Sequence, residues 1–172
     1  MNQLQEFRNA VEIARSRLQG WCSPEKAKAL VDLILQYKPK TVVEIGVFGG
    51  ASAVPMAMAL KAVGSGVLYA IDPWMATESV VGMEDANYEW WSNLDHEAIY
   101  IGFLSALIET KTTDTCNVLR FTSEDASKII GDIDMIHIDG NHSEEKSWRD
   151  IELYFDKVRS TGIIVFDDIN WR

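Results

Sequence analysis

Cysteine is scarce in this sequence, and long apolar runs are missing. The two cysteines, Cys22 and Cys116, lack the CxxC spacing and suggest no disulfide framework, so a reducing compartment is expected. No basic segment with an apolar core opens the chain, and no apolar stretch is long enough to span a bilayer. The sequence therefore predicts a cytoplasmic protein without a membrane partner.

Basic charge is also in short supply. The 172 residues include 16 lysines and arginines against 26 aspartates and glutamates, a formal net charge of −10. This balance argues against non-specific binding to nucleic acid. It fits a site that gathers carboxylates around a cation, although solvated surface acids explain most of them. Repeats, low-complexity tracts and linkers are absent as well, so we expect one domain over residues 1–172.

What the sequence does contain is an alternation of short apolar runs with helix-sized segments. Runs rich in β-branched residues predict strands at 41–45, 67–71, 117–121, 135–138 and 163–166. Apolar residues at helical spacing predict helices, among them N-terminal helices within 1–38 and a helix over 143–158. We expect the first helix to pack on the sheet, with a lid or a dimer contact as alternatives. The alternation predicts a doubly wound α/β fold with a mainly parallel sheet.

A glycine-rich turn over residues 46–50 joins the first strand to the next helix. Its spacing is neither the dinucleotide fingerprint GxGxxG nor a phosphate-binding loop, and a tight turn without a ligand is the plainer interpretation. Two acids favour a binding role. Glu44 lies directly before the turn, and Asp72 ends the second strand, where it could accept hydrogen bonds from ribose hydroxyls. For Asp72, a turn-forming role before Pro73 is the alternative.

Three more acids follow the last two predicted strands. Asp139 ends the fourth strand, and Asp167 and Asp168 follow the fifth. If these strands are neighbours about 4.8 Å apart, the carboxylates repel one another unless they gain protons or a cation. Oxygen ligands favour Mg²⁺, Mn²⁺ or Ca²⁺, whereas a purely structural role would be the capping of turns. Adjacent strand residues point to opposite faces, so Asp167 and Asp168 converge only if the chain bends there.

A metal beside Asp139 would bind a substrate hydroxyl, lower its pKa and align it for reaction, which makes Asp139 a candidate catalytic residue. His142 lies three residues further on and is the candidate general base, because an imidazole titrates near neutrality. Its alternative is a residue that only hydrogen-bonds at the start of a helix. His137 lies inside the fourth strand, where we expect a satisfied core histidine.

The segment 73–95 is longer than an ordinary connection and rich in tryptophan, tyrosine and methionine. So many large apolar side chains predict a cap over a cofactor or a substrate. A small satellite core or an oligomer contact is an equal alternative. Trp74, directly after the acid and proline that end the second strand, is the best candidate for contact with the cofactor.

Together these motifs resemble those of class I S-adenosylmethionine-dependent methyltransferases, most closely the metal-dependent O-methyltransferases of small molecules. The resemblance covers roughly residues 40–172 and rests on residues 43–52, 69–74, 123–124, 138–142 and 165–168. It implies a Rossmann-like methyltransferase fold, S-adenosylmethionine as cofactor, and a divalent metal, Mg²⁺ first, held by Asp139, Asp167 and Asp168. Relatives of this kind act on catechols, sugars and natural-product scaffolds.

The same resemblance implies a role for each cofactor residue. The methionine part would be held by Glu44, Gly46, Gly49 and Ser52, the ribose by Asp72, the adenosine by Trp74, and the adenine side by Ser123 and Glu124. Ser123 also fits a helix cap, and the two roles are compatible. Methyltransferases of this class continue past the fifth strand into an antiparallel pair, which this sequence lacks. We therefore expect either a fragment or a second copy of the chain covering the edge of the fifth strand.

Three functions stay open at this point. The leading hypothesis is metal-dependent O-methylation of a small hydroxylated molecule. The second is a catalytically inactive cofactor-binding module that serves assembly. The third is a nucleotide-linked oxidoreductase, which the glycine spacing disfavours.

Overall fold

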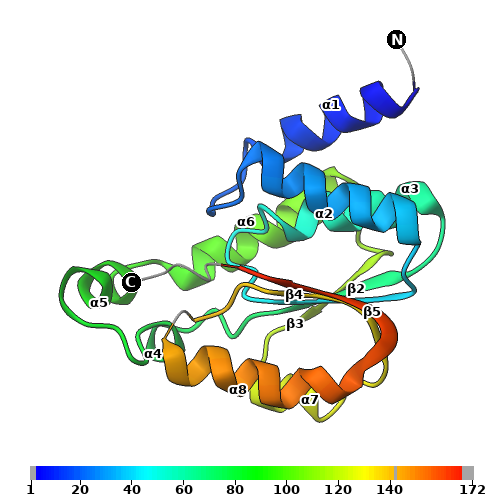
Figure 1. Cartoon of the computed structure of the whole chain (residues 1–172). Coiled ribbons are helices and arrows are strands. Elements are labelled where there is room, and N and C mark those ends of the chain that lie inside the picture. Colours follow the sequence, from blue (N-terminus) through cyan, green and yellow to red (C-terminus); the bar gives the residue numbers. More distant parts are fainter. Residues whose placement is uncertain (1–2, 142, 168–172) are drawn as a thin grey trace.

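A parallel sheet of five strands forms the centre of the structure (Figure 1). The computed structural model describes residues 3–141 and 143–167. Within these residues the sheet order is β3-β2-β1-β4-β5, and every neighbouring pair is parallel. The strands are β1 Thr41–Ile45, β2 Val67–Ile71, β3 Cys116–Leu119, β4 Ile133–Ile138 and β5 Val158–Phe166. The five predicted strands are confirmed, with shifted ends in several of them.

Helices cover both faces of this sheet. Figure 1 shows α1, α2, α3 and α6 on one face and α7 and α8 on the other, while the short helices α4 and α5 lie near the carboxyl ends of the strands. Their bounds are α1 Gln3–Arg15, α2 Pro24–Tyr37, α3 Ala53–Val63, α4 Ala76–Ser79, α5 Asp85–Ser92, α6 His96–Glu109, α7 Ser123–Ser127 and α8 Glu144–Tyr154, followed by the 3₁₀ turn η1 Phe155–Lys157. The predicted doubly wound α/β fold is confirmed. None of the helices in the described residues has the length and apolar character needed to cross a membrane.

Alternate strand residues supply two hydrophobic cores, one under each helical layer. Val42 and Met135 belong to the core beneath α2, α3 and α6, whereas Val43 and Ile136 belong to the core that includes Tyr154 of α8. All five side chains are fully buried. Because successive side chains alternate between faces, this arrangement sets which residues beyond the ends of β4 and β5 point towards α2.

The sequence predicts that the first helix packs on the sheet, but α1 packs mainly on α3 and α2, which lie between it and the strands (Figure 1). Val11 of α1 is buried in the larger core, and so is Leu30 of α2. The Ser23 hydroxyl caps α2 by accepting a hydrogen bond from the Lys26 backbone N–H at 3.1 Å, and Pro24 occupies the first turn. The cap places Lys26 in the first turn of α2.

The end of the last helix differs from the prediction. A helix over 143–158 was expected, but α8 ends at Tyr154 and β5 begins at Val158. The reason is tertiary: Val158 pairs with Ile133 of β4, and a register shift precedes the pairing of Ile163 with Met135. Pairing with β4 therefore starts β5 five residues before the predicted strand 163–166 and includes Val158, the last residue of the predicted helix.

Candidate functional site

A cavity of about 510 Å³ opens at the carboxyl ends of the strands. In a parallel α/β sheet this edge is where ligands bind, because the loops after the strands surround it. Six of the eight predicted cofactor residues line this cavity, namely Gly46, Ser52, Asp72, Trp74, Ser123 and Glu124, and so does Asp139. The remaining two, Glu44 and Gly49, are not among the lining residues.

The glycine turn after β1 is closely packed at two of its glycines. Gly46 has a φ of +83°, and a Cβ there would overlap the backbone carbonyl of Asp139 after β4. Gly49 faces the other way, because a Cβ on it would overlap the backbone of Gln19 in the connection between α1 and α2. Gly46 therefore lets the turn pass close to the end of β4 beside the cavity, whereas Gly49 makes room for the N-terminal segment.

Asp72 organises this turn from the end of β2. Its Oδ2 accepts hydrogen bonds from the backbone N–H groups of Val47 and Phe48 at 3.0 and 2.9 Å, and its Oδ1 accepts from that of Trp74 at 2.7 Å. Burial raises the pKa of Asp72, and the three backbone hydrogen bonds oppose the rise. A carboxylate has about four acceptor positions. Asp72 forms the expected turn and also lines the cavity, and its contact with a ribose stays a prediction.

Glu44 and His137 form a fully buried pair beneath the turn. They are register partners on β1 and β4, and Glu44 Oε1 lies 2.9 Å from His137 Nδ1. Burial raises the pKa of Glu44, while His137 and the Ser52 hydroxyl act in the opposite direction. His137 is buried as predicted, but it is only half satisfied, because its Nε2 has no hydrogen-bond partner. Glu44 can thus influence the cavity through His137 and Ser52.

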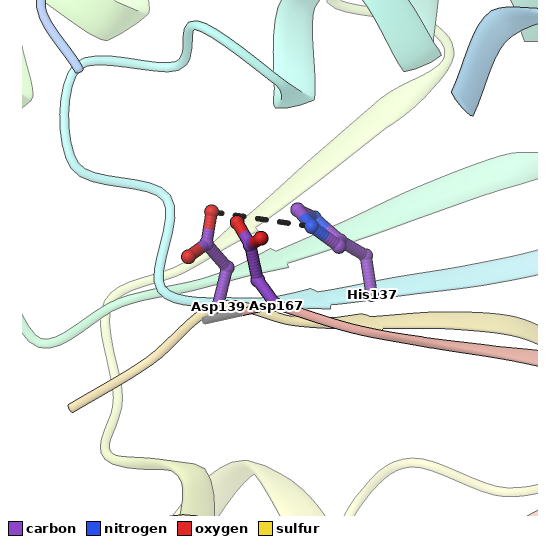
Figure 2. A group of neighbouring side chains, drawn as sticks. All are labelled: His137, Asp139 and Asp167. Carbon is purple, nitrogen blue, oxygen red and sulfur yellow. Dashed lines mark ion pairs between the residues drawn. The ribbon is translucent and has the colours of Figure 1, made fainter. Parts of the chain in front are cut away.

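The carboxylates of Asp139 and Asp167 converge with this histidine on one side of the sheet. Figure 2 shows the three side chains pointing to the same side, and each offers a ligand atom within 4.8 Å of the others. The convergence follows from strand geometry, because residues 137 and 139 are two positions apart on β4 and its extension. Two further predicted residues, the candidate ligand Asp168 and the candidate base His142, lie outside the described residues.

Lys26 forms ion pairs with both of these aspartates, a contact that no sequence pattern indicated. Its Nζ lies 2.8 Å from Asp139 Oδ2 and also forms an ion pair with Asp167. The side chains of Lys26 and Asp139 are each one-fifth exposed, so the interaction is partly shielded from water. A lysine in the first turn of an amphipathic helix is ordinary in sequence terms, and its partner lies 113 positions away. Only the tertiary structure, which places the start of α2 beside the ends of β4 and β5, reveals the contact.

The opposite wall of the cavity is built on β3, α7 and α8. Thr122, rather than the predicted Ser123, caps α7 by accepting a hydrogen bond from the Asp125 N–H at 3.2 Å. The Ser123 carbonyl instead accepts a hydrogen bond from Tyr154 Oη at 2.8 Å. Burial would raise the pKa of Glu124, but hydrogen bonds and Lys146 outweigh it, and the pKa is lowered. Ser123 and Glu124 thus keep their place beside the cavity without a capping role.

Asp150 is a cavity residue that the sequence analysis missed. It lies on α8, is only 3% exposed, and its Oδ1 has no hydrogen-bond partner. Burial raises the pKa of this carboxyl to about 6. A signal for it was hard to find, because an aspartate within a polar helix normally faces solvent.

We expect an Asp150→Asn variant to be more stable than the wild type at pH 7.5 by about 2–3 kcal/mol, since one pKa unit corresponds to about 1.4 kcal/mol. The pKa of Asp150 in the folded state lies above its unfolded value near 3.9. The contribution of Asp150 to the free energy of unfolding is therefore greatest below about pH 4 and is lost as the pH rises through about 6. Urea unfolding at pH 4.5 and 7.5 measures the difference. The exposed Asp132→Asn serves as control, and an equal gain at both pH values for Asp150→Asn would contradict the expectation.

Aromatic side chains form the remaining wall. Trp74 is 2% exposed, donates from Nε1 to the Phe48 carbonyl at 2.9 Å, and lies with its ring 5.8 Å from that of Phe103. Trp74 therefore belongs to the hydrophobic core and also lines the cavity. Nearer the opening, Trp90 and Trp91 of α5 lie 5.2 and 5.8 Å from Trp21, which comes from the connection between α1 and α2. The predicted aromatic segment thus lines the cavity and packs on itself, and Trp21 is an addition that the sequence did not indicate.

Known proteins share this fold. A family model described as a methyltransferase domain matches residues 43–169. Similar solved structures include a Podospora anserina methyltransferase, PaMTH1, bound to SAH (14% identity, TM-score 0.65, 94% of this chain and 61% of that chain). A second is an O-methyltransferase from Bacillus cereus in complex with SAH (16% identity, TM-score 0.63, 96% of this chain and 67% of that chain). A third is the O-methyltransferase TomG from Streptomyces achromogenes, involved in tomaymycin synthesis, in complex with SAM (18% identity, TM-score 0.65, 95% of this chain and 65% of that chain). This chain thus spans less than two-thirds of the length of PaMTH1 and TomG. No curated protein sequence matches it.

Proposed function

The chain belongs to the methyltransferase-domain family, and we propose that it transfers a methyl group from S-adenosylmethionine to a hydroxyl oxygen of a small molecule. The observation that carries this proposal is one cavity lined by the glycine turn, Asp72 and Asp139, with a carboxylate oxygen of Asp167 within 4.8 Å of one of Asp139. Such a cavity can hold a cofactor on one side and an acceptor on the other. The hydroxyl acceptor is supported by fold neighbours that are themselves O-methyltransferases.

Each part of S-adenosylmethionine has a proposed contact along the cavity wall. The methionine part would lie at the turn containing Gly46 and at Ser52, and the ribose would bind the free acceptor position of Asp72. The adenine would lie towards Ser123 and Glu124, with Trp74 behind it. Gly49 would act only through the shape of the turn, and Glu44 through its contact with His137.

The acceptor would lie at the aromatic opening. Trp21 and Trp90 expose two-thirds and more than two-fifths of their surface there, which suits a flat or ring-shaped molecule such as a catechol, a sugar or a natural-product scaffold. Methyl transfer needs the acceptor oxygen in line with the methyl group and its proton removed. His142 stays our proposed base for that proton.

A divalent cation, Mg²⁺ first, would complete the site. When bound, it would lower the pKa of the acceptor hydroxyl and hold the oxygen in place. The donor set fits such an ion, because Asp139 and Asp167 offer carboxylate oxygens and His137 offers a buried Nε2 that has no other partner. Asp168 is the fourth proposed ligand.

Methyl transfer is tested with labelled S-adenosylmethionine and a panel of hydroxylated catechols, sugars and aromatic alcohols. We expect micromolar cofactor binding by calorimetry, no comparable binding of NAD, and transfer to at least one panel member that falls at least tenfold after EDTA treatment. Cofactor binding without any turnover would favour an inactive assembly module instead. Preference for NAD would contradict the proposal, and turnover that EDTA leaves unchanged would remove the metal from it.

A second copy of the chain is the proposed partner at the edge of the sheet. β5 is an edge strand within the described residues, and Ile164 on it is 42% exposed. Apolar edge strands promote pairing with another chain. Light scattering after gel filtration distinguishes a dimer from a monomer.

A further inference from the structure

The position that a metal would take between Asp139 and Asp167 is already approached by a cation of the protein itself. Lys26 Nζ lies 2.8 Å from Asp139 Oδ2 and forms an ion pair with Asp167, so one ammonium bridges the two carboxylates. The cap at Ser23 anchors the backbone of Lys26 in the first turn of α2. The bridge therefore joins a capped helix start to the ends of two strands.

A separate observation points to a ligand at the same place. His137 is fully buried, and its Nε2 lies 3.9 Å from Asp139 Oδ2 without any hydrogen-bond partner. Its Nδ1 is held by Glu44 at 2.9 Å. In the tautomer in which Nδ1 donates to Glu44, Nε2 presents a lone pair towards the aspartates. Metal-binding histidines typically have this arrangement, with a carboxylate behind the ring that fixes its orientation.

The ammonium and a dication cannot serve the same two carboxylates together. A magnesium or manganese ion binds carboxylate oxygen at about 2.0–2.2 Å, which is closer than the hydrogen-bonded ammonium and leaves no room for it between them. Two positive groups at that separation also repel each other strongly in a partly buried site. Lys26 is one-fifth exposed and has a four-carbon stem, so its ammonium has a way out to solvent.

We propose that Lys26 is a built-in counter-ion that competes with a divalent cation for Asp139 and Asp167, with His137 as the third ligand of that cation. The lysine offsets one of the two negative charges of the acidic pair while the metal is absent, and the metal must displace it to bind. The relevance of this competition to catalysis rests on the proposed metal-dependent methyl transfer, but the competition itself is a property of binding.

The test compares Mn²⁺ binding to the wild type and to Lys26→Met, using the electron paramagnetic resonance signal of free Mn²⁺. Methionine has a similar length and no charge, so the carboxylates lose their competitor and keep their surroundings. We expect Mn²⁺ to bind at least tenfold more tightly to Lys26→Met. Lys28→Met is the matched control, because Lys28 lies on the same helix but pairs with Asp32 at the surface. It should bind Mn²⁺ within about twofold of the wild type, since exposed ion pairs contribute little.

A double variant identifies the ligands. Adding Asp139→Asn to Lys26→Met should abolish the gained affinity, with circular dichroism showing that both variants are folded. The proposal is overturned if Lys26→Met binds Mn²⁺ no more tightly than the wild type, or if the gain survives Asp139→Asn. Both readouts are independent of methyl transfer. Failure of the proposed activity would therefore leave this result standing, and failure of the competition would leave cofactor binding and turnover to be judged separately.

Discussion

Replacing Gly46 by alanine is expected to destabilise the fold by about 3 kcal/mol or more and to abolish cofactor binding. Gly46 adopts a φ of +83°, and an added Cβ would overlap the backbone carbonyl of Asp139. Backbone atoms on two strand ends cannot yield as a flexible side chain would, so the turn and the end of β4 must separate. Strain and overpacking of this kind are among the few causes of large mutational effects. Chemical denaturation and calorimetry with S-adenosylmethionine measure the two losses.

Gly102 provides the matched control. It lies within α6, and a Cβ there would meet nothing within 4 Å. Gly102→Ala should stabilise the protein by about 0.5–1 kcal/mol, because glycine in the middle of a helix costs roughly that much relative to alanine. The same substitution is thus expected to have opposite signs at the two positions. Equal effects at Gly46 and Gly102 would show that the close approach to Asp139 does not constrain the turn.

Replacing Asp72 by alanine should weaken S-adenosylmethionine binding by roughly a hundredfold, or about 3 kcal/mol. The carboxylate accepts three backbone hydrogen bonds that hold Val47, Phe48 and Trp74 in place. Hydrogen bonds to a charged group contribute about 1.5–3 kcal/mol each and are not additive, and a tenfold change in affinity corresponds to 1.4 kcal/mol. The variant loses both the shape of the turn and the proposed acceptor of the ribose hydroxyls.

Asp72→Asn separates those two contributions. The amide keeps one acceptor oxygen, so part of the turn survives while the charge is lost. Its affinity should lie between those of the wild type and Asp72→Ala, as measured by calorimetry. Asp132→Ala, which removes a mostly exposed carboxylate, should leave the affinity for S-adenosylmethionine unchanged. If Asp72→Ala binds the cofactor as tightly as the wild type, neither the proposed ribose contact nor the role of the turn in binding holds.

Much of the candidate site was accessible from the sequence because its signals are local. A glycine turn after a strand, an acid at the end of the next strand and acids after two later strands were each visible within about ten residues. In a parallel sheet the carboxyl ends of the strands share one edge, so residues recognised separately, such as Gly46, Asp72 and Asp139, line one cavity. The same local patterns predicted the strand order and the longer helices, but not the short helices α4 and α5 within 73–95. They failed at the start of β5, where pairing with Ile133 overrides a helical pattern.

The contacts that give the site its electrostatic character were decided by tertiary structure. The Glu44–His137 pair joins residues 93 positions apart, and it exists because β1 and β4 are neighbours in one particular register. Lys26 reaches Asp139 only because the start of α2 lies beside the ends of β4 and β5. The sequence alone determined an alternating α/β fold with acids at its ligand edge, since periodicity and turn chemistry act over short distances. Which cation those acids meet depends on how distant elements pack, and that information is not contained in any single segment.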